Sequence, residues 1–441
     1  MTPKLNTWLT ALVLILCIAI AGAHLWVILQ NAVNVPYWDE WGILSPDALP
    51  AGFTFRWIVA EANEHRLVPT KLLAWGLFYI SGHNHILSMV ITDVIYGLLL
   101  ACIVFFARRM TPHLPLWVTL AFIIFLLTPI NWENNFWGFE SSFRFAVLFT
   151  LLAVYFLFSE PQTGRRLALG VLMSVLATYS FFAGLVAVCI TIVLFALFKI
   201  IRALGVSGPQ RRAEYVQLIA VVAPVLLFVG LFFIDYHRHA YLPSIAYPHE
   251  ASFWNFFANL VSWGFGFESH SVMIGALCLL LVLAPIVLEI RKKRLRLSGS
   301  SWAVYVFPIA MLGVLGSVAA GRAHLSASAK ISRYADFAMM LVPFSVLAWA
   351  IFLKDRPGLR RYALIGLWLF CCVGFSYKWL WFPVYKAQHD SRKQGVECIK
   401  TYYKQGGVAD CPTLYSVPIG SMLDDAKRLN LSFYRDIQKE L

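Results

Sequence analysis

Residues 8–30, WLTALVLILCIAIAGAHLWVILQ, contain no Asp, Glu, Lys or Arg. An α-helix rises about 1.5 Å per residue, so this stretch is long enough to cross the ~30 Å hydrocarbon core of a membrane. The same character extends over the chain: 60% of the 441 residues are hydrophobic and only 13% are charged. The mean hydropathy is +0.70. Such a composition predicts an all-α polytopic membrane protein and excludes an ordinary soluble globular domain.

Further apolar stretches recur at lengths suited to crossing a membrane. Two of them share one apolar run, 167–201, which is too long for a single crossing and is interrupted by SFFAG at 180–184. We therefore expect a turn there and about eleven spans in all, near 8–30, 85–107, 115–130, 142–158, 167–180, 182–201, 213–234, 271–290, 301–320, 335–353 and 361–382.

The basic residues predict the orientation of these spans. A net charge of +13 is compatible with nucleic-acid binding, but the Lys and Arg residues fall in short clusters between apolar runs, which favours a bilayer and no nucleic acid as partner. One set of loops holds 18 Lys/Arg and four acids, whereas the opposite set holds eight Lys/Arg and eleven acids, the C-terminal tail left out. By the positive-inside rule the first set, with the N-terminus, is cytoplasmic. We expect a cytoplasmic (inner) membrane protein whose acidic loops and C-terminus are extracytoplasmic.

The two ends of the chain call for separate interpretations. Lys4, the apolar run and Ala21-Gly22-Ala23 also fit a cleavable signal peptide, although the run continues through residues 25–29, which favours an uncleaved span. We predict a catalytic membrane domain at 1–382 and a small extracytoplasmic segment at 383–441. Cys398 and Cys411 lie in that polar segment and predict a disulfide, with two free thiols as the alternative.

The candidate site begins at YWDEW, residues 37–41, where two adjacent carboxylates follow the first span. Acids beside a membrane are costly to keep and point to chemistry. The same loop contains EANEHR at residues 61–66, and other outer loops add cations. The candidate set is Asp39, Glu40, Glu64, His65, Arg66, Arg144, Arg322, Lys330, Arg333 and Tyr334.

Less specific interpretations stand beside this one. Aromatic residues near span ends are often interface anchors, and Arg322 and Arg333 fit cations that snorkel toward lipid phosphates. Asp93, inside a span, fits a partner for a neighbouring helix. The aromatic stretches 53–79 and 252–267 predict helices that lie in the membrane interface. No metal-binding spacing, GxGxxG or P-loop is present, so we expect no metal and no cofactor.

A base, cations and a lipid-facing surface are together suited to one reaction. A sugar on polyprenyl phosphate has a phosphate leaving group, which Arg or Lys neutralises, so its departure needs no general acid. The acceptor hydroxyl needs one base. A glycosidase, in contrast, needs two carboxyl groups at a set separation.

The residues WDEW at 38–41, NEHR at 63–66 and SRY at 332–334, on a multi-span chain, resemble the GT-C superfamily of glycosyltransferases. That superfamily includes protein O-mannosyltransferases, the lipid A aminoarabinose transferase, mycobacterial arabinofuranosyltransferases and O-antigen-modifying enzymes. The resemblance implies a polyprenyl-phosphate sugar donor and an acceptor outside the cytoplasm. It also implies that Asp39 is the base, with Glu40 supporting it.

Further roles follow from that resemblance. Glu64, His65 and Arg66 would position the acceptor or hold the Asp39 loop, with Glu64 as second candidate for the base. The cations Arg144, Arg322, Lys330 and Arg333, with Tyr334, would hold the donor phosphate. The tail is shorter than the soluble domains of many members, which favours a glycan or lipid-linked acceptor over a large protein.

Two functions of other classes stay open. A transporter or flippase of a lipid-linked saccharide would have paired halves and ionisable groups at mid-membrane depth, and only Asp93 meets the second condition. A non-catalytic envelope assembly protein would tolerate loss of Asp39.

Overall fold

The computed structural model describes residues 3–45, 48–237, 243–268, 272–293, 297–325 and 332–441. Over these residues the chain is helical almost throughout, and ten helical stretches are long and apolar enough to cross a membrane. They are built from α1 (Pro3–Asn31), α4 (His85–Met110), α5 (Leu116–Leu126) with α6 (Trp132–Asn135), α7 (Ser141–Phe158), α9 (Phe182–Leu204), α10 (Gly208–Phe232), α12 (Val272–Lys293), α13 (Gly299–Arg322), α14 (Ala335–Ala338) with α15 (Leu341–Phe352), and α16 (Pro357–Phe375) with α17 (Pro383–Gln405). The predicted all-α polytopic membrane fold is confirmed at this level.

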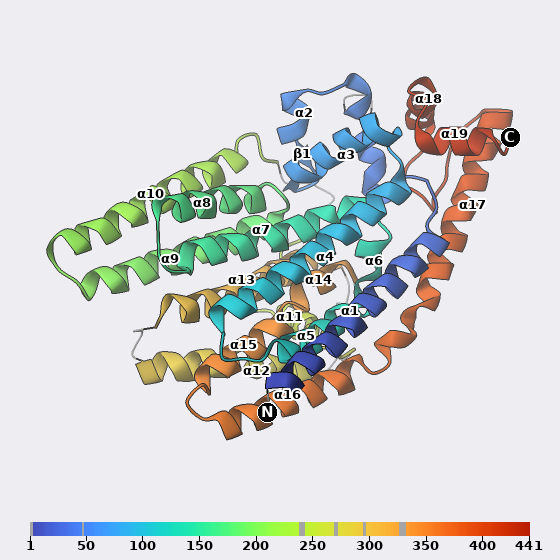
Figure 1. The fold of residues 1–441 in the computed structure, drawn as a ribbon. Coiled ribbons are helices and arrows are strands. Elements are labelled where there is room, and N and C mark those ends of the chain that lie inside the picture. Colours follow the sequence, from blue (N-terminus) through green and yellow to red (C-terminus); the bar gives the residue numbers. More distant parts are fainter. Residues whose placement is uncertain (1–2, 46–47, 238–242, 269–271, 294–296, 326–331) are drawn as a thin grey trace.

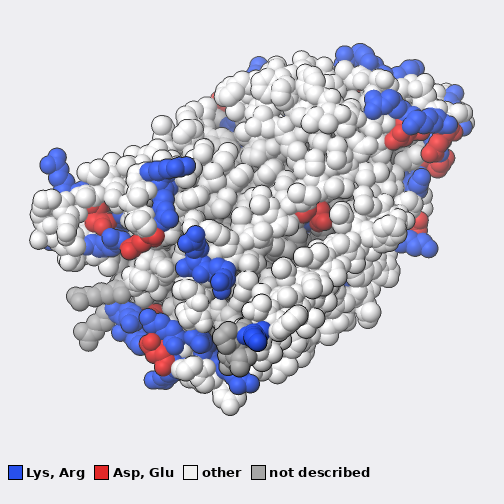
Figure 2. Space-filling model, in the orientation of Figure 1, with Lys and Arg blue, Asp and Glu red and all other residues white. Residues whose placement is uncertain are grey.

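The long helices lie side by side, and the short elements collect at one end of the bundle (Figure 1). At that end lie α2 (Phe55–Val59), α3 (Val68–Ser81) and the strands β1 (Glu61–Ala62) and β2 (His65–Arg66), together with α18 (Gly420–Arg428) and α19 (Ser432–Gln438). Figure 2 shows a broad band with few charged side chains between two charged ends of the molecule. This band is what a membrane-spanning region requires, because charges in hydrocarbon are costly.

The fifth expected span corresponds to α8 (Gly164–Thr178), which has 15 residues. At 1.5 Å per residue it is about 22 Å long, and it is not among the ten stretches that are long and apolar enough to cross a membrane. The expected turn is present, since α8 and α9 are separate helices joined at 179–181. The basic clusters at 165–166 and 199–202 do lie at the same end, because Arg202 forms a 2.6 Å ion pair with Glu160, just before α8. At the other end of α8, the Tyr179 carbonyl accepts a hydrogen bond from Val68 in the first loop.

The helix α11 (Ala251–Gly264) fills the second stretch that was expected in the interface. Its first half exposes Trp254, as an interfacial helix should. Its second half, 258–264, is buried on all sides, and it packs on α12, α13 and α14. One reason is the contact of Gly264 with Ala338, where any side chain larger than hydrogen would meet the Ala338 carbonyl. This helix therefore belongs in part to the core of the bundle.

The C-terminal segment packs back onto the first loop. The backbone N–H of Trp38 donates to the carbonyl of Leu414 at 2.8 Å, and that of Ser432 donates to Gly82 at 2.8 Å. The rings of Trp41 and Phe433 meet edge-on with centroids 5.9 Å apart. The segment also contains a disulfide between Cys398 and Cys411, the pairing that the spacing predicts. These contacts make the segment a wall of the end of the molecule that carries the candidate site.

Candidate functional site

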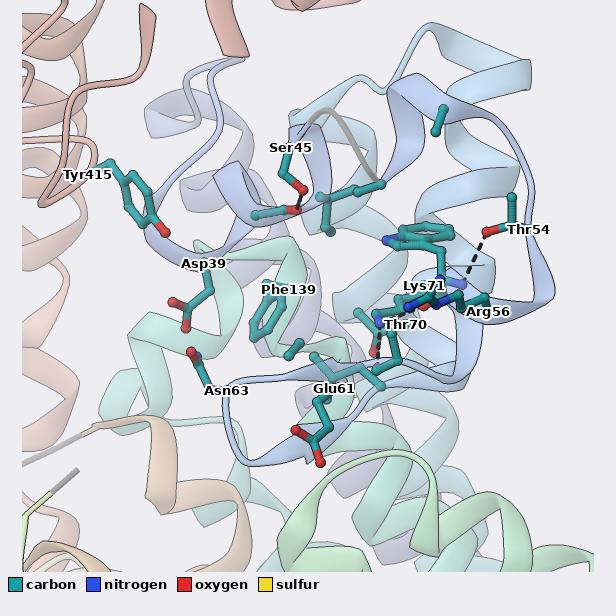
Figure 3. Close-up of a pocket in the computed structure, with 18 residues that line it drawn as sticks. Asp39, Ser45, Thr54, Arg56, Glu61, Asn63, Thr70, Lys71, Phe139 and Tyr415 are labelled. Atoms are coloured by element: carbon teal, nitrogen blue, oxygen red, sulfur yellow. Dashed lines mark hydrogen bonds between the residues drawn. The ribbon is translucent and has the colours of Figure 1, made fainter. Parts of the chain in front are cut away.

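A cavity of about 690 Å³ opens at the end where the short elements collect. Figure 3 shows Asp39 and Tyr415 at one side of this cavity, Phe139 between, and Lys71 and Arg56 at the other side. Its wall is made by the first loop, by Phe139 beside α7, and by Tyr415 of the C-terminal segment. Tyr415 had no signal in the sequence, because its place depends on how the tail folds back.

Asp39 is carried by the short 3-10 helix η1 (Trp38–Leu44). Trp38, immediately before it, has a positive φ of 45°. A bulky residue in this region costs about 1–3 kcal/mol and persists only where its surroundings enforce it, and such strain gathers at functional sites. Here the Trp38–Leu414 hydrogen bond holds the bend. The bend directs Asp39 into the cavity.

Glu40 points the other way, into the protein. It is 2% exposed and accepts a hydrogen bond from the Tyr37 N–H at 3.0 Å. Its carboxylate also lies 3.4 Å from His85 Nδ1. Burial raises the pKa of Glu40, but the charges of His85 and Arg392 outweigh it and leave the pKa lowered. Two adjacent residues in a short helical turn cannot easily point the same way, and Glu40 accordingly faces away from the cavity and fastens η1 to the bundle.

The electrostatic surroundings of Asp39 suit a base. Burial raises its pKa, while the positive charge of Arg333 and a hydrogen bond from Asn63 act against that rise without cancelling it. Figure 3 shows the Asn63 side chain pointing toward the Asp39 carboxylate. A raised pKa strengthens a carboxylate as a proton acceptor.

Asn63 and Glu64 form the turn of a two-stranded hairpin, in which Glu61 pairs with Arg66 and Ala62 with His65. Asn63 has a positive φ of 54°, a conformation that Asn tolerates better than most residues. His65 is buried, its ring is 3.7 Å from that of Phe181, and burial lowers its pKa to about 4. His65 is therefore uncharged at neutral pH. Its ring contact with Phe181 packs the hairpin onto the α8–α9 turn.

Arg66 is committed to backbone carbonyls. Its Nε donates to Phe232 at 2.8 Å, and its other nitrogens donate to Val59 and Ile234. These contacts fasten the first loop to the end of α10. Arg66 therefore anchors the hairpin, of which it is a part, and it does not line the cavity.

A second cavity, of about 290 Å³, lies on the other side of the hairpin. Its wall is largely apolar, with Phe181, Phe182 and Val318 among the lining residues, and it is bordered by Glu64, Arg322 and Tyr334. Arg322 donates to Glu64 at 2.9 Å and to the Tyr334 hydroxyl at 3.0 Å. Glu64, the second candidate for the base, is thus the ion-pair partner of Arg322 in this structure.

Arg333 has a buried donor that no described residue accepts. Its guanidinium lies over the rings of Trp137 and Tyr334, with centroids at 5.8 and 6.0 Å. Its Nε is buried and has no hydrogen-bond partner among the described residues. The negative charges of Glu140, Glu133 and Asp39 act on the Arg333 guanidinium.

The backbone that carries Arg333 is held by the segment 131–135, a contact that sequence reasoning missed. Glu133 accepts hydrogen bonds from the Ser332 hydroxyl at 2.7 Å and from the Arg333 N–H at 3.1 Å. Asn134 donates to the Arg333 carbonyl at 2.9 Å. No local pattern reveals this pairing, since the two segments are about 200 positions apart.

Arg144 lies in a separate buried network. It is fully buried and lies 3.4 Å from Asp336 and 3.6 Å from Asp93. Asp336 also accepts from Asn131 at 2.6 Å and Asn134 at 2.7 Å. A buried cation needs counter-ions, and Arg144 has them. The expectation that Asp93 pairs with a neighbouring helix is confirmed, and none of these residues lines either cavity.

Lys330, which was expected to help hold the donor phosphate, lies outside the residues that the structure describes. Within the described residues, no group of three or more His, Cys, Asp or Glu side chains is placed to hold a metal ion.

Comparison with known proteins gives no relative from which a role can be transferred. No protein-family model, no curated protein and no solved structure matches this chain.

Proposed function

We propose that this protein is a membrane glycosyltransferase of the GT-C type, which transfers a sugar from polyprenyl phosphate to an acceptor hydroxyl outside the cytoplasm. The observation that carries the proposal is the position of Asp39. It lines a cavity with both polar and apolar lining residues, it is influenced by the charges of Arg333 and Arg322, and Arg322 borders a second, largely apolar cavity.

Each cavity suits one substrate. A polyprenyl chain is apolar, and the lining by Phe181, Phe182 and Val318 offers it an apolar surface. Its phosphate then lies at the border of that cavity, where Arg322 supplies donors to the leaving oxygen atoms, and Arg333, which lies over the ring of the lining residue Tyr334, supplies others. The acceptor occupies the larger cavity, whose volume of about 690 Å³ is within the range of small-molecule sites.

The reaction proceeds with few groups. Asp39 accepts the proton of the acceptor hydroxyl as its oxygen attacks the anomeric carbon, and the bond from that carbon to the phosphate oxygen breaks. The phosphate departs as a dianion, and the guanidinium groups stabilise the developing charge. Arg333 is the principal clamp, because Arg322 already donates to Glu64 and Tyr334.

Gene deletion in the source cells tests this function directly. Mass spectrometry should show an envelope glycan that loses the mass of one sugar unit on deletion. The wild-type gene should restore it, and the Asp39→Asn gene should not. Unchanged glycans would contradict the transferase. Accumulation of a complete lipid-linked saccharide on the cytoplasmic face would instead support a flippase.

A further inference from the structure

Lys71, on α3, carries a positive charge that no carboxylate neutralises. It is 4% exposed, and its Nζ donates to the carbonyls of Trp57 at 2.8 Å and Ala60 at 2.7 Å. Neither acceptor is charged, and within the described parts of the chain Lys71 forms no ion pair. A buried ammonium without a counter-ion is costly.

Lys71 has donor capacity left for a ligand. An ammonium has three N–H donors, and the two carbonyls use two of them. Lys71 also lines the 690 Å³ cavity. A cavity-lining cation with a free donor and no counter-ion is a site at which an anion from solution gains both charge and a hydrogen bond.

A second cation lies at the same side of the cavity. Arg56, on α2, lines the cavity and is drawn beside Lys71, away from Asp39 (Figure 3). It is exposed, and it forms no ion pair with any described residue. Glu61 also lines the cavity, but its carboxylate lies 4.0 Å from Arg66 and accepts from the His237 N–H at 3.3 Å. The two cations therefore have no acid of their own.

We propose that the larger cavity receives an acceptor saccharide with an anionic group, a carboxylate or a phosphate, which Lys71 and Arg56 bind while an acceptor hydroxyl lies at Asp39. This inference rests on the proposed function and narrows its acceptor class. The charge pattern of the cavity sets the direction of binding, since Asp39 repels an anion at its own side.

Ligand binding without any donor tests the inference separately from transfer. The purified full-length protein in detergent is titrated with glucuronate, glucose 6-phosphate, glucose and inorganic phosphate, and the melting temperature is followed. Glucuronate or glucose 6-phosphate should raise the melting temperature at concentrations where glucose has no effect. The more effective of the two identifies the anionic group as a carboxylate or a phosphate.

Variants assign the effect to the two cations. Lys71→Met keeps the apolar stem and should weaken binding of the anionic sugar by roughly ten- to a hundredfold, the value of a hydrogen bond to a charged group. Arg56→Gln should weaken it severalfold. Because Arg56 is exposed, this variant should fold even if loss of the Lys71 hydrogen bonds prevents folding. Arg108→Gln, at the far end of α4, is the matched control and should bind as the wild type does.

Three results would overturn the inference. They are binding of glucose as tight as that of the anionic sugars, no binding of any of them, and unchanged binding in both variants. An equal effect of inorganic phosphate on all variants would likewise show only a general anion effect. Because no donor is present, any of these results would leave the transferase proposal standing. Anion-dependent binding in a protein that transfers no sugar would contradict the transferase alone.

Discussion

Replacing Asp39 with Asn should slow sugar transfer by about 10²–10⁴-fold, the usual contribution of a general base. At 1.36 kcal/mol for each factor of ten, this corresponds to about 2.7–5.4 kcal/mol of transition-state stabilisation. Asn has nearly the shape of Asp and keeps hydrogen bonding with Asn63, but it accepts no proton. The donor should bind as before, because in the proposed site its phosphate is held by Arg333 and Arg322 and not by Asp39.

The same substitution should not destabilise the fold. Burial raises the pKa of Asp39, so the folded state binds this proton more tightly than the unfolded state does. The stability linked to protonation is present at low pH and is lost as pH rises through the folded pKa. At pH 7 the wild type therefore carries the cost of a partly buried charge, and neutral Asn removes that cost. We expect a melting temperature equal to or above that of the wild type.

The assay measures initial rates with a purified polyprenyl-phosphate sugar and acceptor, alongside melting curves of each variant. The wild-type rate should fall at acidic pH as Asp39 becomes protonated, with its midpoint above the ordinary range for Asp. Transfer by Asp39→Asn within about threefold of the wild type, together with an inactive Glu64→Gln, would show that the base is Glu64. If neither substitution changes the rate, the transferase itself is refuted.

Three further predictions concern the surrounding residues and the topology. Arg333→Ala should lower the transfer rate by about 10²–10³-fold, and Arg333→Lys should restore it only in part, because an ammonium lacks the planar fork of donors; a normal rate in the alanine variant would leave Arg333 as a contact to lipid headgroups. Glu40→Gln should instead lower the stability by about 1–3 kcal/mol through loss of its contacts with His85 and Tyr37, and its melting temperature should fall while the donor still binds; an unchanged melting temperature would contradict that structural role. A reporter active only outside the cytoplasm should give signal at residue 45 and at the C-terminus but none at Lys293, and signal at Lys293 would place the site on the cytoplasmic face.

Much of the fold follows from simple patterns in the sequence. Apolar length predicts the crossing helices, because each must satisfy its own backbone in hydrocarbon. The clusters at 165–166 and 199–202 predict the α8–α9 turn, which the Arg202–Glu160 ion pair bears out. The expected span 167–180 nearly coincides with α8 (Gly164–Thr178), so the shortness of this helix also follows from the sequence.

The site was predictable only in its local parts. The contrast between Asp39 and Glu40 follows from the geometry of neighbouring residues, because successive side chains diverge. The place of Tyr415 depends on how the tail packs on η1. The hydrogen bond from the Arg333 N–H to Glu133 joins two segments that are distant in the sequence. Arg144 resembled the other cations in sequence, but its counter-ions Asp93 and Asp336 come from other helices. Such pairings depend on helix packing, which no single stretch of sequence encodes.

The position of a bound polyprenyl phosphate decides most directly whether the two cavities serve donor and acceptor. The purified protein would be imaged by electron cryomicroscopy with polyprenyl phosphate added, and Arg333→Ala would serve as the control. We expect the phosphate between Arg333 and Arg322, with the apolar chain along the cavity lined by Phe181 and Val318, and no ordered phosphate in the variant. A phosphate bound at another part of the surface, or one bound equally well by the variant, would contradict the proposed transferase site.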